Sequence, residues 1–506
     1  MKVALVGFMG AGKSSAARSL GAGSADVDEV IEGRTGRRVQ EIFAADGEAA
    51  FRELEEQVTL ELLDDPSVKT VALGGGAIAS TRIREALANV RVVWLDVEVD
   101  LAWERVGGGR GTTRPLASDP QQFERLHAQR RPLYEALADV VLPATRALSL
   151  GAVLEAVDGL GAKDARVLWA TTASGDYPVF IGVGLVRDRG FWPATIDGRR
   201  VVISDYNAGR HYGEAFDPTL AGIRVMPGEQ SKTLAHAEIV WTEMVRHGVT
   251  RTDVVVALGG GVVGDLAGFC AAAYQRGMRH VQVPTTLVSQ VDSAYGGKTG
   301  VDLAEAKNYV GAFHQPSAVI VDTATLDTLP PEELAAGYAE VVKTGLLAGG
   351  ELWELISRGA APGDPRVIAG CALTKLRIVA EDEHDTGVRQ LLNLGHTVGH
   401  AIETATGYAR YRHGEAVALG LLAALRLSGA DALRDQAAAL LAEAGLPLEL
   451  DPAVDLEQVI FATARDKKRV GEGPVPFVLC PAPGRAEFGQ HVPPAELRAA
   501  VRELYG

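Results

Sequence analysis

Cysteine is scarce in this sequence. The 506 residues include only Cys270, Cys371 and Cys480, and no two of them form a C-x-x-C pair. This excludes a disulfide framework and a zinc site built from cysteines, and a reducing compartment is expected. The chain also lacks a run of about 18 uncharged apolar residues, which a membrane-spanning helix needs. The short apolar run at the N-terminus is broken by Gly7 and Gly10, unlike a signal peptide. We therefore expect a soluble cytoplasmic protein.

Basic residues are fewer than acidic residues in this sequence. Lys and Arg number 50 against 65 Asp and Glu, so the formal net charge is −15. A nucleic-acid partner is disfavoured because phosphate backbones bind basic surfaces, whereas small anionic substrates need only a local basic pocket. Hydrophobic residues at 47% and charged residues at 23% are ordinary for a globular protein. The length is about three times the modal domain size, so several domains are expected.

Hydrophobic patterning predicts an α/β protein with a helical C-terminal part. Apolar strands alternate with helical patterns, which indicates parallel sheets covered by helices. The predicted strands are 3–6, 70–73, 91–95, 201–204, 253–261, 280–284 and 317–322. Helical spacing dominates after Leu326, at 332–348, 367–383, 392–406 and 414–430. We predict a P-loop α/β domain at 1–160, a linker at 161–165, a nucleotide-binding α/β domain at 166–325 and an all-helical domain at 326–506.

The first candidate site is a phosphate loop. Residues 7–14, GFMGAGKS, fit G-x-x-x-x-G-K-[ST] between a predicted strand and a predicted helix. Glycines let backbone N–H groups converge on phosphate oxygens, the lysine neutralises them, and the Ser14 hydroxyl can hold Mg²⁺. The alternative is a glycine-rich turn with a chance lysine. The predicted ATP-binding residues are Gly10, Ala11, Gly12, Lys13, Ser14, Ser15 and Arg114.

Three further patterns lie near this loop in the sequence. Asp26 and Asp28 form a D-x-D pair that can hold magnesium water or orient a hydroxyl, or can simply be solvated acids at a helix start. Gly74–Gly76 follow a strand, where backbone can approach a ligand or make a tight turn. Arg110 and Arg114 lie in a glycine-rich segment suited to a closing lid, or to an exposed basic loop.

Together these residues resemble shikimate kinase over about residues 1–160. The matching pieces are GFMGAGKS, DVD at 26–28, RTGRRVQEIFAADGEAAFRELE, LGGGA, TTRPL and QRRPLYE. The resemblance implies that Asp28, Arg52, Gly75 and Arg130 bind shikimate, with the two arginines on its carboxylate. Asp28 would orient the hydroxyl that is phosphorylated, and Arg114 would cover ATP. The segment between Lys13 and Asp28 is a few residues shorter than the family usually shows.

A second candidate site combines glycine loops with polar residues. Residues 258–265, LGGGVVGD, follow an apolar strand, and residues 227–232 read PGEQSK. Neither loop is specific by itself, because glycine clusters also make turns. Polar residues are nevertheless dense among the glycines of the following segment, which suits an anion-binding cleft better than a core. They are Thr285, Thr286, Asp292, Lys298, Lys307 and Asn308.

A candidate metal site lies in the predicted helical part. His396 and His400 are four residues apart, on one face of a helix, and Glu340 and His413 occur in nearby motifs. One acid and several imidazoles make a typical catalytic zinc set with an open position for substrate. Spacing alone nominates His396 and His400 as the ligand pair; the alternative is helix histidines that make ordinary hydrogen bonds.

Residues from about 166 to 506 resemble 3-dehydroquinate synthase. The match runs through PGEQSK, ALGGGVVGDLAGF, YQRG, VPTTLVSQVDS, GGKTGV, KNYVGAFHQP, TLPPEELAAGYAEVVK, EDEHDTGVRQLLNLGHTVGHAIE, HGEAVA and RDKK. The resemblance changes the ligand set to Glu340, His396 and His413, and makes His400 a substrate-site residue. It implies zinc or cobalt, and NAD⁺ that oxidises a hydroxyl of 3-deoxy-D-arabino-heptulosonate 7-phosphate, so that phosphate leaves and the ketone is then reduced back.

The same resemblance implies the remaining site residues. NAD would be held by Asp205, Pro227, Gly228, Glu229, Gln230, Ser231, Lys232, Gly261, Val262, Val263, Gly264, Asp265, Thr285, Thr286, Lys298, Lys307, Thr325, Leu326, Asp327 and Thr328. The heptulosonate phosphate would be held by Arg276, Asp292, Asn308, Lys343, Lys375, Arg389, Asn393, His400 and one of Lys467 and Lys468. Arg276 would reach across the interface of a homodimer. Lys298, Lys343, Lys375, Arg389, Asn393 and His400 are the candidate catalytic residues of this half, and Lys13, Asp28 and Arg114 those of the kinase-like half.

Two residues depart from the family pattern beside the cleft: Asp302, where asparagine is frequent, and Tyr295, where valine is frequent. The leading interpretation is a fused shikimate kinase and 3-dehydroquinate synthase. One alternative makes the larger half another sugar-phosphate cyclase or a metal-dependent polyol dehydrogenase. Another makes the first half a non-catalytic ATP-binding module that regulates the synthase.

Overall fold

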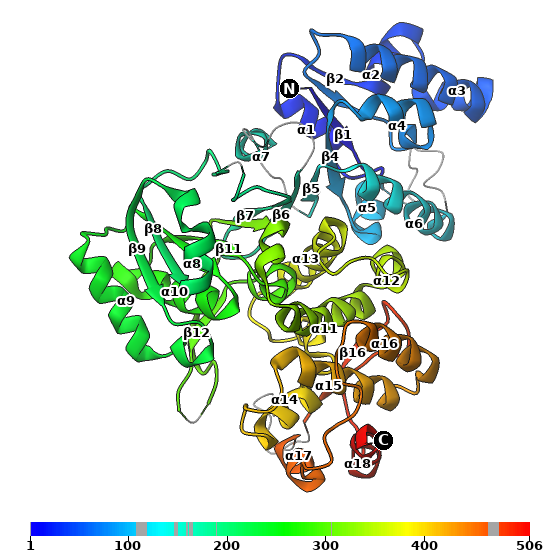
Figure 1. Ribbon diagram of the computed structural model, residues 1–506. Helices are drawn as coiled ribbons and strands as arrows, with labels where there is room; N and C mark the ends of the chain where they lie inside the picture. The colour runs from blue at the N-terminus through cyan, green and yellow to red at the C-terminus, as the bar shows by residue number, and fades with distance from the viewer. Residues whose placement is uncertain are drawn as a thin grey trace. The chain divides into compact units, whose positions relative to one another are not determined.

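The computed structural model describes residues 2–107, 119–145, 150–157, 160, 165–188, 190–304, 306–463 and 475–505 (Figure 1). The chain divides into two compact units. The first unit comprises Met1–Ala170, Pro178–Phe180 and Phe191–Ile196. The second comprises Thr171–Tyr177, Ile181–Gly190 and Asp197–Gly506.

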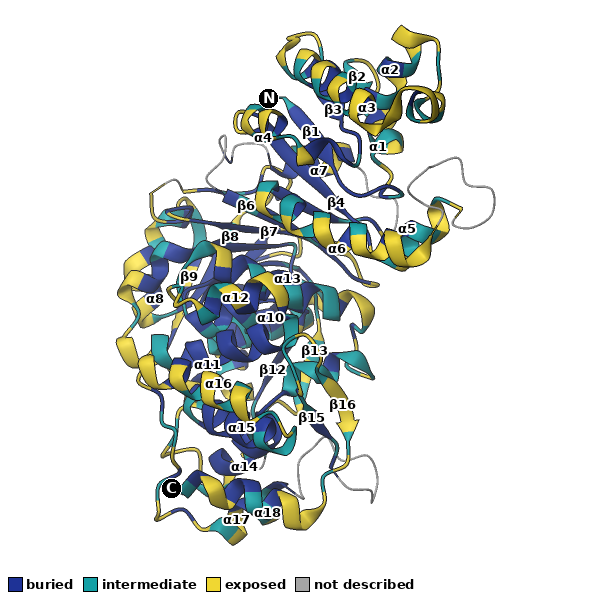
Figure 2. Cartoon of the chain, turned by 90° about the vertical axis from the view of Figure 1, so that its right-hand side faces the viewer, coloured by how far each residue is buried: buried dark blue, intermediate teal, exposed yellow. Residues whose placement is uncertain are grey.

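A parallel sheet forms the centre of the first unit. Its strands pair in the order β2-β3-β1-β4-β5-β6. β1 and β4 are buried along their whole length, as expected for parallel strands covered on both faces (Figure 2). The strands are β1 Val3–Val6, β2 Ser24–Asp26, β3 Thr70–Ala72, β4 Arg91–Asp96, β5 Val140–Pro143 and β6 Ala165–Thr171.

Aspartate side chains cap the N-termini of two helices in the first unit, and one of these caps positions a predicted site residue. The Asp26 carboxylate accepts a hydrogen bond from the Glu29 N–H, which starts α2 and puts Asp28 in its first turn. Asp119 caps α6 in the same way. The helices are α1 Lys13–Ser19, α2 Val27–Thr35, α3 Val39–Asp64, η1 Ala77–Ala79, α4 Thr81–Leu87, α5 Val99–Arg105, α6 Pro120–Leu137 and α7 Leu150–Ala156.

The second unit begins with a set of parallel strands. Its strands pair in the order β14-β11-β10-β8-β9, and an antiparallel hairpin of β12 and β13 lies beside it. Apolar side chains of β8, β9 and β10 pack with α9 and α10 in one continuous core. The strands are β7 Asp176–Gly182, whose residues are shared between the units, β8 Arg200–Asp205, β9 Thr219–Val225, β10 Val254–Gly259, β11 Arg279–Pro284, β12 Lys298–Val301, β13 Val310–Phe313 and β14 Ala318–Asp322.

Helices and tight turns connect these strands and carry most of the polar residues. A π-helix at Ser289–Ser293, η6, follows β11. π-Helices are rare in proteins, and many of those known occur at functional sites. The other connecting elements are α8 Tyr206–Tyr212, η3 Gly213–Phe216, η4 Glu229–Ser231, α9 Leu234–Arg246, α10 Gly261–Ala273, η5 Tyr274–Arg276 and η7 Thr323–Thr328.

The rest of the second unit is helical. It contains α11 Pro331–Ala348, α12 Gly350–Ser357, α13 Pro365–Glu381, η8 Val388–Asn393, α14 His396–Ala405, α15 His413–Leu427, α16 Asp431–Glu443, α17 Leu456–Thr463, α18 Pro494–Arg502 and η9 Glu503–Tyr505. A two-stranded antiparallel sheet of β15 Phe477–Leu479 and β16 Glu487–Gln490 adds to it, which the sequence pattern does not predict. These strands are short, and residues 487–490 are mostly exposed, so neither gives a strong apolar signal.

Glycines allow α14 and α15 to pack closely. Gly420 of α15 lies against the backbone of Gly395 and Gly399, and a Cβ at Gly420 would lie 2.8 Å from the Gly399 nitrogen. Gly395 itself precedes α14 with a φ of 77°, a left-handed conformation that favours glycine. This contact sets the first turn of α14, which carries His396, against the middle of α15.

The predicted fold class is confirmed: a P-loop-type parallel α/β part precedes a second α/β part and a helical part. All the predicted strands are present, with ends within two residues of those expected. No helix in the described ranges combines the length and the apolar character that crossing a membrane requires. Cys270, Cys371 and Cys480 are free and buried, and burial raises the pKa of Cys270 to about 12 and that of Cys480 to about 11.

Candidate active sites

The phosphate loop lies between β1 and α1. Gly7, Gly10 and Gly12 have positive φ angles, and a Cβ at Gly10 would lie 2.7 Å from the Ala102 carbonyl oxygen. No other residue type fits this path without strain. The Lys13 ammonium donates to the Gly7 carbonyl at 2.7 Å and to the Phe8 carbonyl at 3.1 Å, so it lies over the loop. The loop has the shape of a phosphate-binding loop.

Two arginines and an aspartate gather at the glycines after β3. The Gly75 carbonyl accepts hydrogen bonds from Arg130 at 3.0 Å and from the Tyr134 hydroxyl at 2.6 Å. A Cβ at Gly76 would collide with the Arg52 guanidinium, and one at Gly74 would lie 3.5 Å from the Asp28 carboxylate. The structure therefore brings Asp28, Arg52, Gly75 and Arg130 together from α2, α3, the β3 loop and α6.

Acidic neighbours orient Arg52 in this group. Its guanidinium contacts Glu55 at 2.6 Å and Glu48 at 3.0 Å. Burial lowers the pKa of Arg52, but the two carboxylates outweigh it and the net shift is upward. Burial lowers the pKa of Arg130 and raises that of Tyr134. Arg130 also lies over the Phe8 ring at 6.0 Å, which connects the arginine group to the phosphate loop.

A cavity of about 1300 Å³ lies in the second unit. Its walls come from the loops after β8, β9, β10 and β11 on one side, and from α14 and the start of α15 on the other. Predicted residues in its lining are Asp205, Pro227, Gly228, Glu229, Lys232, Gly261, Val262, Val263, Asp265, Thr285, Thr286, Asp292, Lys307, Asn308, Thr328, His400 and His413. The loops at the carboxyl ends of parallel strands are the usual place for a nucleotide in an α/β sheet.

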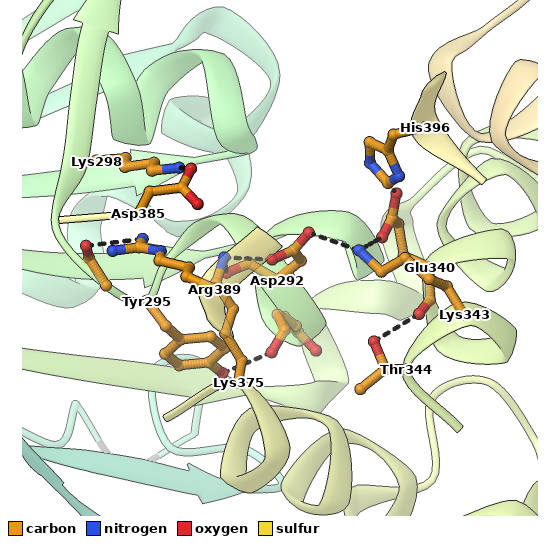
Figure 3. A network of polar contacts seen from close by, with 12 residues as sticks. Asp292, Tyr295, Lys298, Glu340, Lys343, Thr344, Lys375, Asp385, Arg389 and His396 are labelled. Atoms are coloured by element: carbon orange, nitrogen blue, oxygen red, sulfur yellow. Dashed lines mark hydrogen bonds and ion pairs between the residues drawn. The ribbon is translucent and has the colours of Figure 1, made fainter. Parts of the chain in front are cut away.

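A buried ionic network adjoins the cavity (Figure 3). The Lys375 ammonium donates to both the backbone carbonyl and the carboxylate of Asp292, at 2.7 Å for the carbonyl. Lys343 lies 3.4 Å from the other oxygen of the same carboxylate and also pairs with Glu340. Burial opposes ionisation of Asp292, but the two ammonium groups hold the pKa of Asp292 well below its usual range. Asp292 is therefore an ionised carboxylate, aimed by the π-helix η6 at two lysines.

One carboxylate and two imidazoles converge at the end of this network. Their candidate ligand atoms, from Glu340, His396 and His413, all lie within 4.8 Å of one another. Nε2 of His396 is 3.4 Å and Nε2 of His413 is 3.5 Å from Glu340 Oε1. The opposite nitrogens are engaged: Nδ1 of His396 with the Leu394 carbonyl at 3.1 Å, and Nδ1 of His413 with Glu403 at 3.4 Å. This arrangement, with outer partners fixing each ring, is typical of a zinc site.

Family comparisons match both halves of the chain. Residues 9–158 match the shikimate kinase model, residues 222–336 the N-terminal model of 3-dehydroquinate synthase and residues 337–469 its C-terminal model. The 3-dehydroquinate synthase of Symbiobacterium thermophilum is 41% identical over 353 residues, which cover 65% of this chain and 98% of that protein. The chain belongs to the 3-dehydroquinate synthase family. Residues 9–158 are its shikimate kinase domain.

Other relatives agree with this assignment. The 3-dehydroquinate synthase of Pseudomonas aeruginosa is 41% identical and is matched over 98% of its length, by 67% of this chain. A solved structure of 2-epi-5-epi-valiolone synthase from Streptomyces hygroscopicus, with NAD⁺ and Zn²⁺ bound, has a TM-score of 0.59 at 26% identity and covers 66% of this chain and 98% of that one. A 2-deoxy-scyllo-inosose synthase at 24% identity shares the fold, with the same TM-score.

In the synthase half, the segment 382–389 organises further predicted residues. The Asp382 carboxylate accepts hydrogen bonds from the backbone N–H groups of Thr386, Gly387 and Arg389, at 2.7 to 3.1 Å. These bonds lower the pKa of Asp382 to about 2, against the opposing effect of burial. Asp385 pairs with Lys298 across the segment (Figure 3). The buried Arg389 donates to the Gly296 carbonyl at 3.0 Å, which braces the glycine turn before Lys298.

Several predicted residues of the synthase half lie outside the cavity lining or outside the described residues. Among described residues, the lining leaves out Gln230, Ser231, Gly264, Arg276, Lys298, Thr325, Leu326, Asp327, Glu340, Lys343, Lys375, Arg389, Asn393 and His396. Lys343, Lys375, Arg389 and Glu340 are buried behind it. Arg114, Lys467 and Lys468 lie outside the described residues, as does Arg110. Their predicted roles, like those of the other site residues, stay predictions.

Sequence reasoning missed several acidic partners in both halves. Glu48 and Glu55 lie four residues before and three after Arg52, so helical spacing could have revealed both. Glu403 follows His396 by seven residues and lies on the same face of α14, a signal that was also available. Asp385 meets Lys298 only through the tertiary fold, and no sequence signal indicates that pair.

Proposed function

We propose that this protein catalyses two reactions of the shikimate pathway. The kinase half phosphorylates shikimate with Mg-ATP, and the synthase half converts 3-deoxy-D-arabino-heptulosonate 7-phosphate to 3-dehydroquinate and phosphate. The observation that carries the proposal is the occurrence of two groups of functional side chains on one chain. One is a phosphate loop beside Arg52 and Arg130, and the other is the donor set of Glu340, His396 and His413 beside a large cavity.

In the kinase half, two arginines bind the substrate carboxylate and an aspartate orients the reacting hydroxyl. Arg52 and Arg130 bind the shikimate carboxylate, because planar guanidinium groups match carboxylates in a bidentate way. Asp28 orients the hydroxyl that attacks the phosphoryl group and accepts its proton. Gly10, Ala11, Gly12, Lys13, Ser14 and Ser15 hold the ATP phosphates, and the Ser14 hydroxyl holds Mg²⁺. Arg114 covers the nucleotide.

In the synthase half, the cavity holds NAD through the loops of the α/β part. Gly261, Val262 and Val263 offer backbone N–H groups at the start of α10, where an anion is favoured, whereas the Gly264 N–H donates to the Gly260 carbonyl at 3.0 Å. Asp205 follows β8, the usual place for an acid that binds a ribose hydroxyl. Lys232, Lys307 and Thr328 line the same cavity. When bound, NAD⁺ would accept a hydride from the carbon that bears a substrate hydroxyl, with loss of the hydroxyl proton, and would return the hydride later in the cycle.

The metal site fits a divalent zinc or cobalt ion. Glu340, His396 and His413 would hold it. Nδ1 of His396 contacts the Leu394 carbonyl and Nδ1 of His413 contacts Glu403, so Nε2 of each ring is left to face the ion. Held by these residues, a divalent ion would supply Lewis-acid polarisation of the substrate hydroxyl and of the derived ketone. Lys343 pairs with both Glu340 and Asp292, and its positive charge favours the ionised form of each acid.

The substrate anion is held by the cations around the network. Lys298, Lys375, Arg389 and His400 carry donors for its carboxylate, hydroxyls and phosphate, and Asn308 and Asn393 offer amides. Asp292 orients a substrate hydroxyl, and Lys467 or Lys468 completes the site. We propose that the chain works as a cytoplasmic homodimer in which Arg276 reaches the partner's phosphate site, and that its domains are 1–160, 166–325 and 326–506.

The test uses the purified full-length protein. Heptulosonate phosphate with NAD⁺ and Zn²⁺ should release phosphate without accumulation of NADH, and shikimate should stimulate ADP formation from Mg-ATP. Phosphate release without shikimate-dependent ADP would reduce the first half to an ATP-binding module. Failure to release phosphate, with metal and NAD⁺ bound, would overturn the synthase assignment and favour another sugar-phosphate cyclase. Net NADH production would indicate a polyol dehydrogenase.

A further inference from the structure

A second group of possible metal ligands lies beside the first. Within the described part of the chain, His400, Glu403 and His413 each bring one candidate ligand atom to within 4.8 Å of the others. His400 and Glu403 are three residues apart on α14 and therefore lie on the same face of that helix, and His413 is the first residue of α15. This second group shares one histidine with the set of Glu340, His396 and His413.

His413 presents a different nitrogen to each group. Its Nε2 lies 3.5 Å from Glu340, and its Nδ1 lies 3.4 Å from the Glu403 carboxylate. The ring centres of His400 and His413 are 5.9 Å apart. With Zn–N bonds of about 2.0–2.1 Å, two imidazoles bound to one ion have ring centres roughly 5–6 Å apart. The spacing of the two rings therefore suits an ion between them.

The chemistry of the second group also suits a divalent cation. Two imidazoles with one carboxylate are a donor set that zinc sites use. Glu403 is buried, and a buried carboxylate is costly unless hydrogen bonds or a positive charge compensate it. Nδ1 of His413 supplies one partner, and a bound cation would supply the charge.

The second group faces the cavity. His400, Glu403 and His413 all belong to the lining of the cavity of about 1300 Å³. Glu340 and His396 are buried and do not belong to that lining. An ion in solution therefore reaches the second group directly through the cavity, and its remaining coordination positions are open to water.

We propose that His400, Glu403 and His413 form a second site for a divalent transition-metal ion, which inhibits the synthase half when that ion is in excess. An ion there would engage His400, which is proposed to hold the substrate, and would fill part of the cavity. With both sites filled, His413 would bridge the two ions through its two nitrogens, and the proton of its ring would be released to water. The inference rests on the proposed metal site of Glu340, His396 and His413.

The relative affinity of the two sites follows from the shared histidine. The first ion binds Nε2 of a ring that keeps its proton, whereas the second ion has to displace that proton. The second ion also binds close to the positive charge of the first. Both effects weaken the second site, so we expect it to fill only after the first.

The test is equilibrium dialysis of the metal-free, untagged full-length protein against buffered Zn²⁺ without ATP, followed by metal analysis. We expect the wild type to bind two ions per chain, the second at least about tenfold more weakly than the first. His400→Gln should keep the first ion and lose the second. The exposed His247 also lies 3.9 Å from a glutamate, Glu243, so His247→Gln is the matched control for adventitious binding and should follow the wild type.

Glu340→Gln should give the reciprocal result. It removes a ligand of the first site and leaves all three ligands of the second, so it should lose the tighter ion and keep the weaker one. This variant also protects the test if His400→Gln folds poorly. In the phosphate-release assay, wild-type activity should fall in proportion to the occupancy of the second site, whereas the residual activity of His400→Gln should not fall with excess Zn²⁺.

The possible failures are distinguishable. A single ion per chain in the wild type, or a second ion that persists in His400→Gln, would overturn the second site and leave the first in place. Two bound ions with undiminished phosphate release would overturn the inhibition. Absence of any bound ion in the wild type would instead overturn the metal site of the proposed function itself.

Discussion

Asp382 shows how one carboxylate stabilises a loop of the synthase site. Its bonds to three backbone N–H groups lower its folded-state pKa to about 2, below the ordinary value of 3.8. A lowered pKa contributes stability above the ordinary value, and that stability is lost as the pH falls toward 2. For a partly exposed group this is about 1 kcal/mol at pH 7 after allowance for solvent screening.

We therefore expect Asp382→Asn to lower the free energy of unfolding by about 1 kcal/mol at pH 7. The difference from the wild type should shrink between pH 4 and pH 2, as the wild-type carboxylate becomes protonated. Denaturant unfolding at several pH values measures it. A difference that stays constant down to pH 2 would contradict the assigned ionisation.

A substitution of Lys13 tests the activity of the kinase half at the scale of a single residue. Its ammonium lies over the phosphate loop, where it would neutralise the transferred phosphoryl group. We expect Lys13→Ala to lower kcat for shikimate phosphorylation by about 100- to 1000-fold, as for loss of one transition-state donor. Phosphate release by the synthase half should be unchanged, and it is measured on the same preparation. Changed synthase kinetics, with no kinase activity to lose, would favour a regulatory ATP-binding module.

At the scale of elements, the packing of α14 against α15 positions the proposed metal ligands. Glu403 of α14 contacts Nδ1 of His413 on α15, which turns Nε2 toward Glu340. We expect Glu403→Gln to weaken zinc binding by about 10- to 100-fold, as for other outer-shell carboxylates. Competition with a chromogenic chelator measures the affinity. The exposed Glu449→Gln is the matched control, and equal zinc affinity in both variants would contradict this role for Glu403.

The close packing of α14 against α15 can also be tested by mutation. A methyl group at Gly420 would press on the backbone of Gly395 and Gly399 and move α14, which carries His396. We expect Gly420→Ala to cost about 1–3 kcal/mol of stability, typical of overpacking, and to lower synthase activity. Gly213→Ala is the control, because Gly213 has a helical φ of −58° and no atom near the position of a new Cβ. Equal unfolding midpoints for the two variants would count against the close packing.

Sequence patterns predict elements better than they predict contacts between them. The buried parallel strands, such as β10, are apolar along their length and are correctly predicted. Spacing on one helix pairs His396 with His400, because a single helix shows only its own faces. The convergence of His413 and Glu340 with His396 depends on the packing of α11, α14 and α15, for which only the family resemblance gives a sequence signal. For the same reason no pattern indicates that Lys298 faces Asp385.

On the scale of the whole molecule, the two activities differ in their metal. The kinase half uses Mg-ATP, whereas the donor set proposed for the synthase half contains two imidazoles, which suit zinc or cobalt. We expect phenanthroline, in the presence of millimolar Mg²⁺, to abolish phosphate release while shikimate-dependent ADP formation continues. Added Zn²⁺ should restore the first activity. Equal loss of both activities would contradict separate metal requirements.

The burial of all three cysteines has a practical consequence for work on this molecule. Their raised pKa values and lack of exposure leave almost no thiolate within reach of an alkylating reagent or peroxide. The native chain therefore provides an unlabelled background for maleimide dyes. Two cysteines introduced on exposed helices of one half would be the only reactive sites, so a distance within that half becomes measurable by spectroscopy without first removing the natural cysteines.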